Sequence, residues 1–176
     1  MRRGFLIGIV LSSLTVYSQE QMYFEVVPQE KSGIDFTNTL TETAEMNYLT
    51  FQYMYNGGGV AIGDINNDGL QDVYFTGNQV SDKLYLNKGG MQFEDITKKA
   101  LDKNVDQGWH TGVTMADVNG DGWLDIYVCA VVGIHGFNGH NELYINNHDG
   151  TFTEKASDYG LDFDSYSSSA SFFDYD

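Results

Sequence analysis

One nine-residue pattern occurs twice in the chain and starts a third time. Residues 64–72 read D-I-N-N-D-G-L-Q-D, and residues 117–125 read D-V-N-G-D-G-W-L-D. The sequence ends on Asp174-Tyr175-Asp176, where the same pattern begins again. Because self-similarity at a fixed spacing is the signature of repeat architectures, the chain is expected to fold as a series of similar units.

The chemistry of the pattern favours a calcium loop. Carboxylate or amide oxygens stand at positions 1, 3, 5 and 9 of each copy, and Gly stands at position 6. Oxygen ligands at alternating positions, followed by a glycine that permits a sharp turn, suit a hard cation with flexible coordination such as Ca²⁺.

Short apolar segments surround each loop in the same order. The residues before and after the first loop, 59–63 and 73–75, match residues 112–116 and 126–128 around the second. Further along, Leu84-Tyr85-Leu86-Asn87 matches Leu143-Tyr144-Ile145-Asn146, and a Gly turn follows each. One unit therefore reads as four short strands with the metal loop between the first two, which is the pattern of a propeller blade. The predicted fold class is all-β, a partial β-propeller.

Residues 1–18 are typical of an export signal. Arg2 and Arg3 precede an apolar run from Phe5 to Val16, and Val16-Tyr17-Ser18 forms a small-residue cleavage pattern. The apolar run is too short to span a bilayer, so no transmembrane segment is predicted. An ordinary secretory signal is favoured over a twin-arginine signal, and the expected location is secreted, periplasmic or cell-surface.

The composition limits the classes of partner. The formal net charge is −16, which opposes binding to nucleic acid or to an anionic membrane. Cys129 is the single cysteine and lies in an apolar run, so we expect a buried thiol and no disulfide. Metal loops would then have to stabilise this exported domain.

The predicted organisation has five parts. The signal peptide covers residues 1–18, and an outer closing strand with a crossover segment covers 19–56. Two blades follow at 57–111 and 112–168, and residues 169–176 start a third blade that is truncated. Residues 23–27 are expected to form the outer strand of a blade that other strands complete, because closing the ring protects sheet edges.

The repeat resembles the FG-GAP/VCBS repeat of integrin-α-type β-propellers. The carrying residues are 59–72 and the matching stretch 112–125, and the likeness extends over about residues 24–176. Ser32-Gly33-Ile34-Asp35-Phe36 also resembles exported bacterial proteins similar to cartilage acidic protein. The resemblance implies about two and a half four-stranded blades of a seven-bladed ring.

The resemblance also implies which residues bind Ca²⁺. Side chains would supply most ligands in each loop, and the backbone carbonyl at position 7 would supply one more. The expected ligands are Asp64, Asn66, Asp68, Leu70 (carbonyl) and Asp72 in the first loop, Asp117, Asn119, Asp121, Trp123 (carbonyl) and Asp125 in the second, and Asp174 and Asp176 in the third.

The loops and the histidines also admit other interpretations. A helix-flanked calcium hand requires an acidic ligand at position 12, but Phe75 and Val128 stand there. Metal-free turns rich in Asp and Asn remain an alternative. The four histidines match no strong zinc pattern; His110 and His148 are expected to stand alone, and His135 and His140 to be solvated loop residues.

The expected function is that of an exported calcium-binding module with a structural, adhesive or ligand-binding role. Its partner would be an extracellular protein or glycan. No catalytic motif is found, so the chain is not expected to be an enzyme. The alternative is a non-catalytic or catalytic part of a secreted enzyme active on polysaccharides or lipids.

Overall fold

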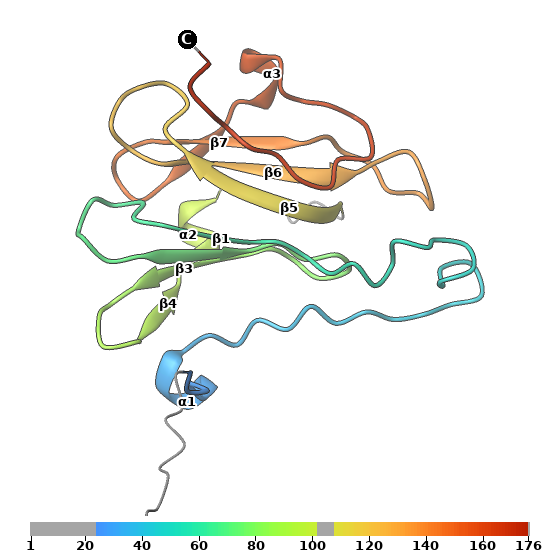
Figure 1. The fold of residues 1–176 in the computed structure, drawn as a ribbon, viewed down its shortest axis with the longest axis horizontal. Helices are drawn as coiled ribbons and strands as arrows, with labels where there is room; N and C mark the ends of the chain where they lie inside the picture. The colour runs from blue at the N-terminus through green and yellow to red at the C-terminus, as the bar shows by residue number, and fades with distance from the viewer. Residues whose placement is uncertain (1–23, 102–107, 176) are drawn as a thin grey trace, which may run out of the picture.

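The computed structural model describes residues 24–101 and 108–175. These residues form two four-stranded antiparallel sheets, stacked one on the other (Figure 1). The strands of the first sheet are β1 (Val60–Gly63), β2 (Asp72–Phe75), β3 (Lys83–Asn87) and β4 (Phe93–Asp95). Those of the second are β5 (Trp109–Ala116), β6 (Asp125–Val131), β7 (Glu142–Asn146) and β8 (Phe152–Glu154).

In both sheets the strands lie in chain order, each paired with the next. The second strand of each sheet is the most buried, since every residue of β6 is buried and only the last residue of β2 is partly exposed. Strands covered on both faces need continuous apolar runs, and residues 126–131 form such a run. The predicted all-β, propeller-like fold is confirmed, and in each blade the nine-residue loop lies between the first two strands. Within the described chain, the two sheets do not close into a ring.

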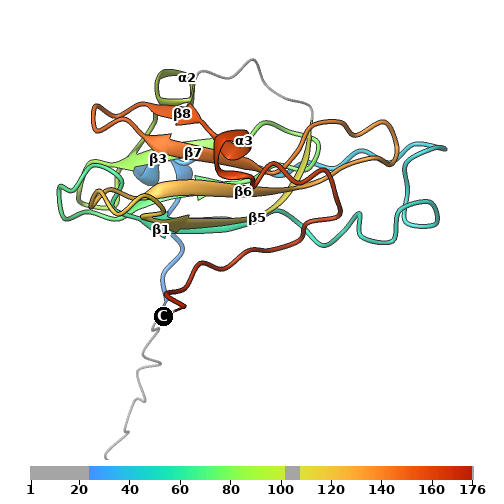
Figure 2. The same cartoon turned by 90° about the horizontal axis from the view of Figure 1, so that it is seen from above.

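The described residues also form three one-turn helices: α1 (Gln29–Ser32) before the first sheet, α2 (Thr97–Ala100) between the sheets and α3 (Ala156–Tyr159) after the second. Among the residues described, no helix is long and apolar enough to cross a membrane. Figure 2 shows α2 near the edge strand β8, and α3 near β7. After α2, Leu101 bridges to Phe152 of β8, so the connection between the blades also holds the last strand of the second blade.

The main hydrophobic core lies between the two sheets. It joins Tyr74 and Leu84 of the first sheet to Ile126, Val128 and other buried residues of the second. Each blade alone would leave one of these apolar faces in water, so the blades stabilise one another. Cys129 is buried as predicted, and burial raises the pKa of its thiol to about 11.

The innermost strands approach each other at glycines. A Cβ atom on Gly59 would lie 2.7 Å from the carbonyl oxygen of Thr111. One repeat later, a Cβ atom on Gly112 would lie 2.6 Å from the carbonyl oxygen of Ser168. Residues 168–169 thus take the same place beside β5 that the start of β5 takes beside β1. No strand forms at 169–173, however, so a third blade stays a prediction.

The N-terminal segment packs differently along its length. Residues 24–28 are in neither sheet, and the side chains of Phe24 and Val26 are 92% and 90% exposed. The outer strand expected at 23–27 is therefore unpaired here, and its role in closing a blade stays a prediction. Further on, Phe36 stacks on Phe75 with ring centroids 5.0 Å apart.

The crossover segment packs against the second blade through buried aromatic and apolar side chains. Phe51 and Met54 form a second core with Trp109 and Val131. Phe51 is buried among these side chains. The tyrosines of the crossover, at 48, 53 and 55, are instead more than half exposed.

Asn146 at the end of β7 joins the blades by hydrogen bonds. Its side-chain amide donates to the carbonyl of Ile65 in the first loop at 2.8 Å and to that of Leu124 at 3.1 Å. The equivalent residue of the first blade, Asn87, donates at 2.8 Å to the exposed carbonyl of Gln71 within its own blade. The two asparagines therefore differ in burial and in what they connect.

We expect Asn146→Ala to lower the free energy of unfolding by about 2–3 kcal/mol, because it leaves a buried carbonyl of the neighbouring blade without its donor. Asn87→Ala is the matched control and should cost about 1 kcal/mol, since water can replace its bond. Urea unfolding of both variants measures the difference. Equal losses would contradict an inter-blade role for Asn146.

Candidate metal centres

The first loop folds into a tight turn around the carboxylate of Asp64. Its two oxygens accept the backbone N–H groups of Asp68 at 3.1 Å and Gly69 at 2.7 Å. The side-chain oxygen of Asn66 accepts the same Asp68 N–H at 3.1 Å. Gly69 has a φ of +86°, a conformation that favours glycine, which explains the glycine at position 6.

The second loop repeats this network almost bond for bond. The Asp117 carboxylate accepts the N–H groups of Gly120, Asp121 and Gly122 at 2.8, 3.0 and 2.9 Å. Asn119 again accepts the N–H of the residue at position 5, at 3.0 Å, and Gly122 also has a φ of +86°. The two sequence copies are therefore two copies of one loop structure.

The aspartate at position 9 is the buried member of each loop. Both oxygens of Asp72 accept backbone N–H groups, from Ile65 at 3.0 Å and from Asn87 of β3 at 2.7 Å. Asp125 does the same with Val118 and Asn146, at 3.0 and 2.8 Å. Each carboxylate thus ties the start of its loop to the third strand of its blade.

Electrostatics at position 9 favour a cation. Burial raises the pKa of Asp72 and of Asp125, although the two N–H bonds oppose the shift. Repulsion from the carboxylates at positions 1 and 5 of the same loop raises these pKa values further. A divalent ion among these oxygens would offset both the desolvation and the repulsion. The donor set, all oxygen and mostly anionic, fits Ca²⁺.

In both loops the side chains at positions 1 and 3 accept the N–H of position 5, whereas the aspartate at position 9 accepts backbone N–H groups. Within the described chain, the three carboxylates of each loop do not form a group whose ligand atoms all lie within 4.8 Å of one another, so the full ligand set stays a prediction. Leu70 and Trp123 lie at the expected position 7, where their N–H groups bond to the aspartates at position 5 at 2.8 and 2.9 Å. Asp174 is exposed and belongs to no loop of this kind, and Asp176 lies outside the described residues. The third site is therefore not assembled by the described chain.

The two loops contact each other. The side chain of Asn67 in the first loop donates to the carbonyl of Gly122 in the second at 3.2 Å. His148, in the turn after β7, lies 2.9 Å from Asp121 and stacks on Trp123 with ring centroids 4.8 Å apart. This contact lowers the pKa of Asp121. The expectation that His148 stands alone is wrong, because the Gly turn folds back over the second loop.

A second group of metal-type ligands is buried between the blades. Asp82, His110 and Glu142 each offer one atom within 4.8 Å of the others, the one such group of three among the residues described. His110 Nδ1 lies 2.7 Å from Asp82, and Nε2 lies 3.9 Å from Glu142. The expectation that His110 stands alone is therefore also wrong.

Two tyrosines hold the carboxylates of this cluster in place. Tyr74 donates its hydroxyl to Asp82 and Tyr144 donates to Glu142, both at 2.8 Å. Burial beside these carboxylates raises the pKa of both tyrosines well above the usual range. The cluster contains the right atoms to hold a metal ion. The 2.7 Å contact between Asp82 and His110 is also a normal hydrogen-bond distance. The geometry therefore suits a purely structural, hydrogen-bonded cluster equally well.

The sequence contains one indirect sign of this cluster. Asp82 corresponds to Asn141 in the second repeat, and both interact with a tyrosine of the second strand, Tyr74 or Tyr127. The repeat thus predicts that position 82 faces inward. Nothing local predicts that His110 and Glu142, which belong to the other blade, meet it there.

We expect His110→Phe to destabilise the fold by about 3–5 kcal/mol, because it leaves two buried carboxylates without the imidazole between them. The control is His140→Phe, at a half-buried loop residue with a bond to the adjacent carbonyl of Asn141. That change should cost less than about 1 kcal/mol. Urea unfolding gives both values, and similar costs would show that the cluster contributes little.

Comparison with known families agrees with this geometry. Residues 64–128 match the family model of the FG-GAP-like repeat. The match begins at the first residue of the first calcium-type loop and ends inside β6, so it contains both loops. A search of curated proteins gives no match to the chain. The repeated loops, the blade topology and this match agree that residues 64–128 of the chain form an FG-GAP-like repeat.

Proposed function

We propose that the protein is an exported, calcium-stabilised module of the β-propeller type that binds an extracellular ligand. The observation that carries the proposal is the duplicate loop. Two sequences that differ at four of nine positions form the same hydrogen-bonded turn with the same oxygen atoms at positions 1, 3, 5 and 9. Turn formation alone does not require four oxygen-bearing side chains in each copy.

The ligands proposed for Ca²⁺ are those of the first two loops, with carbonyl groups at Leu70 and Trp123. Bound Ca²⁺ supplies positive charge among carboxylates that otherwise repel one another. The loops themselves connect the first and second strands of each blade and touch through Asn67 and Gly122. Holding them rigid would therefore also hold the blades against each other.

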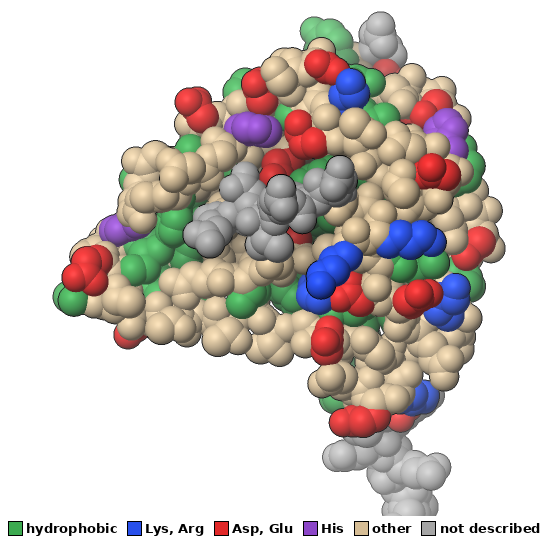
Figure 3. Space-filling model, turned by 180° about the vertical axis from the view of Figure 1, so that it is seen from behind, with side chains coloured by type: hydrophobic (Ala, Val, Ile, Leu, Met, Phe, Trp, Pro, Cys, Tyr) green, Lys and Arg blue, Asp and Glu red, His purple; other side chains and the backbone are tan. Residues whose placement is uncertain are grey.

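The acidic surface supports an extracellular role of this kind. Asp and Glu side chains are distributed over the face in Figure 3, with a few Lys or Arg side chains between them. Such a surface opposes association with polyanions and keeps the protein soluble. The FG-GAP-like repeat is a non-catalytic repeat, which fits a binding module. Export rests on residues 1–18, which lie outside the described part of the chain.

Calcium at saturating concentration is expected to raise the melting temperature, and a chelator to lower it. A site that is filled at about 100 times its Kd adds about 2.7 kcal/mol, or roughly 5–10 °C for a domain of this size. Differential scanning fluorimetry with Ca²⁺ or EGTA measures the shift. The same melting curve in both conditions would refute the metal role.

Single-loop variants separate the two sites. We expect Asp68→Ala and Asp121→Ala each to remove one bound Ca²⁺ in calorimetric titration, and the double variant to remove both. Asp164→Ala is the control, because this exposed aspartate belongs to neither loop. Loss of both ions from either single variant would show that the loops do not bind independently.

A further inference from the structure

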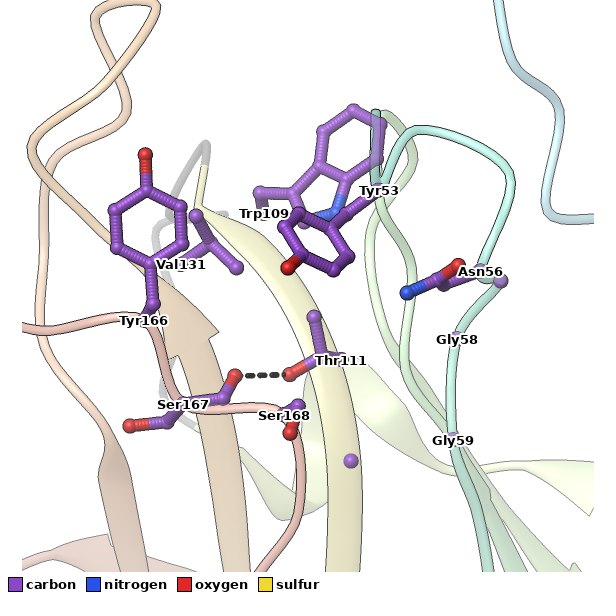
Figure 4. A pocket seen from close by; sticks show the side chains of 12 residues that line it. Tyr53, Asn56, Gly58, Gly59, Trp109, Thr111, Val131, Tyr166, Ser167 and Ser168 are labelled. Atoms are coloured by element: carbon purple, nitrogen blue, oxygen red, sulfur yellow. Dashed lines mark hydrogen bonds between the residues drawn. The ribbon is translucent and has the colours of Figure 1, made fainter. Parts of the chain in front are cut away.

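A cavity opens at the end of the inner strands remote from the metal loops. Its volume is about 720 Å³. Most of its lining comes from three segments that each lead into an inner strand or into its counterpart in the next repeat: 56–59 before β1, the first residues of β5, and 166–168 (Figure 4). Tyr53 and Val131 complete the lining. Ligand pockets of proteins have volumes of this order.

Aromatic rings form one part of the wall. Tyr53 and Tyr166 are 59% and 55% exposed, so their ring faces are available to a ligand. Figure 4 shows Tyr53 in front of Trp109, with Tyr166 across the cavity. Trp109 is buried and packs edge-on against Phe51, with ring centroids 5.0 Å apart. The aromatic wall is therefore supported from behind by the second core.

Uncharged polar groups form the rest of the cavity wall. The hydroxyl of Thr111 donates to the carbonyl of Ser167 at 2.7 Å, which fixes its orientation beside the cavity. The Ser167 hydroxyl accepts the side-chain amide of the buried Asn141 at 2.8 Å, and the amide of Asn56 stands on the opposite side. None of the described residues that line the cavity has a charged side chain.

We propose that this cavity binds a neutral carbohydrate. The C–H faces of a sugar ring are apolar and pack on aromatic rings, whereas its hydroxyls need donors and acceptors around the edge. The tyrosine rings provide the apolar packing surface, and the side chains of Thr111, Ser167 and Asn56 provide the donors and acceptors. The wall has no charged side chain that would select a cationic sugar. The net charge of −16 on the protein repels anionic sugars.

The inference rests on the ligand-binding part of the proposed function and specifies its ligand class. It does not depend on calcium at an individual loop, because no residue of either loop lines the cavity. At one wall of the cavity, Gly57 leaves open space, since a Cβ atom there would have no neighbour within 4 Å, whereas Gly58 and Gly59 pack against the backbone of Thr76 and Thr111.

The test uses the fluorescence of Trp109. The chain has two tryptophans, so Trp123→Phe leaves Trp109 as the only reporter and retains the backbone carbonyl at position 123. The full chain carrying this change is titrated with cellobiose, maltose, lactose and N,N′-diacetylchitobiose, and with digalacturonate as an anionic comparison. We expect a saturable change for at least one neutral disaccharide with a Kd of about 1 mM or below, and none for digalacturonate.

Variants then place the binding in the cavity. Tyr53→Ala and Tyr166→Ala should each weaken it by about tenfold or more, as loss of an aromatic anchor does. Tyr53→Leu and Tyr166→Leu serve where the alanine variants melt early, because they keep apolar bulk but lose the flat ring. Tyr159→Ala, an exposed tyrosine on α3 outside the cavity, is the control and should bind as tightly as the parent.

Failure of all four neutral disaccharides to bind would overturn the proposal, as would unchanged affinity in a Tyr53/Tyr166 double variant. The titrations are run in Ca²⁺ and in EGTA beside the melting curves. A calcium-dependent melting temperature without sugar binding refutes the carbohydrate inference alone. Sugar binding without any effect of calcium refutes the metal role alone.

Discussion

The aspartate at position 9 of each repeated loop connects the parts of a blade. Asp72 and Asp125 are buried, and each uses both carboxylate oxygens to hold two backbone N–H groups. One N–H belongs to the loop and the other to the third strand, so a single side chain sets the position of the loop relative to the sheet. Burying a carboxylate is costly unless its oxygens are satisfied, and these four bonds satisfy them. A free-energy cost of burying the charge remains, and repulsion from the other carboxylates of the loop increases it. A bound cation would offset this cost.

Contacts between the repeats follow from that arrangement. Once each loop is held on its own blade, Asn67 reaches Gly122, and Asn146 reaches the carbonyl of Ile65. At the other side of the interface, Asp82 of the first blade meets His110 and Glu142 of the second. Polar groups at both ends thus enclose the apolar core between the sheets. Buried polar contacts of this kind specify one register of packing where apolar contacts alone would permit several.

The strand order of both blades could be predicted because it depends on local signals. Short apolar segments before and after each loop, and the Gly turns before β4 and β8, recur in the same order in both repeats. The hydrogen-bonded turn of each loop was equally predictable, since the N–H partners of Asp64 and Asp117 lie in the same short segment. The pairing of segments without a local partner was harder to predict. Residues 24–28 have β-forming side chains but pair with neither sheet.

The all-β repeat, the oxygen set of each loop and the buried thiol follow from the amino-acid sequence alone, because they depend on spacing and hydrophobicity within one repeat. The contacts across the blades depend instead on how the two sheets pack. His110 is far from both Asp82 and Glu142 along the chain, and its sequence context alone indicates an isolated histidine. The cavity beside Tyr53 and Tyr166 likewise arises from segments that are distant in sequence. Packing between repeats is set by shape and burial over the whole interface, and no local pattern records it.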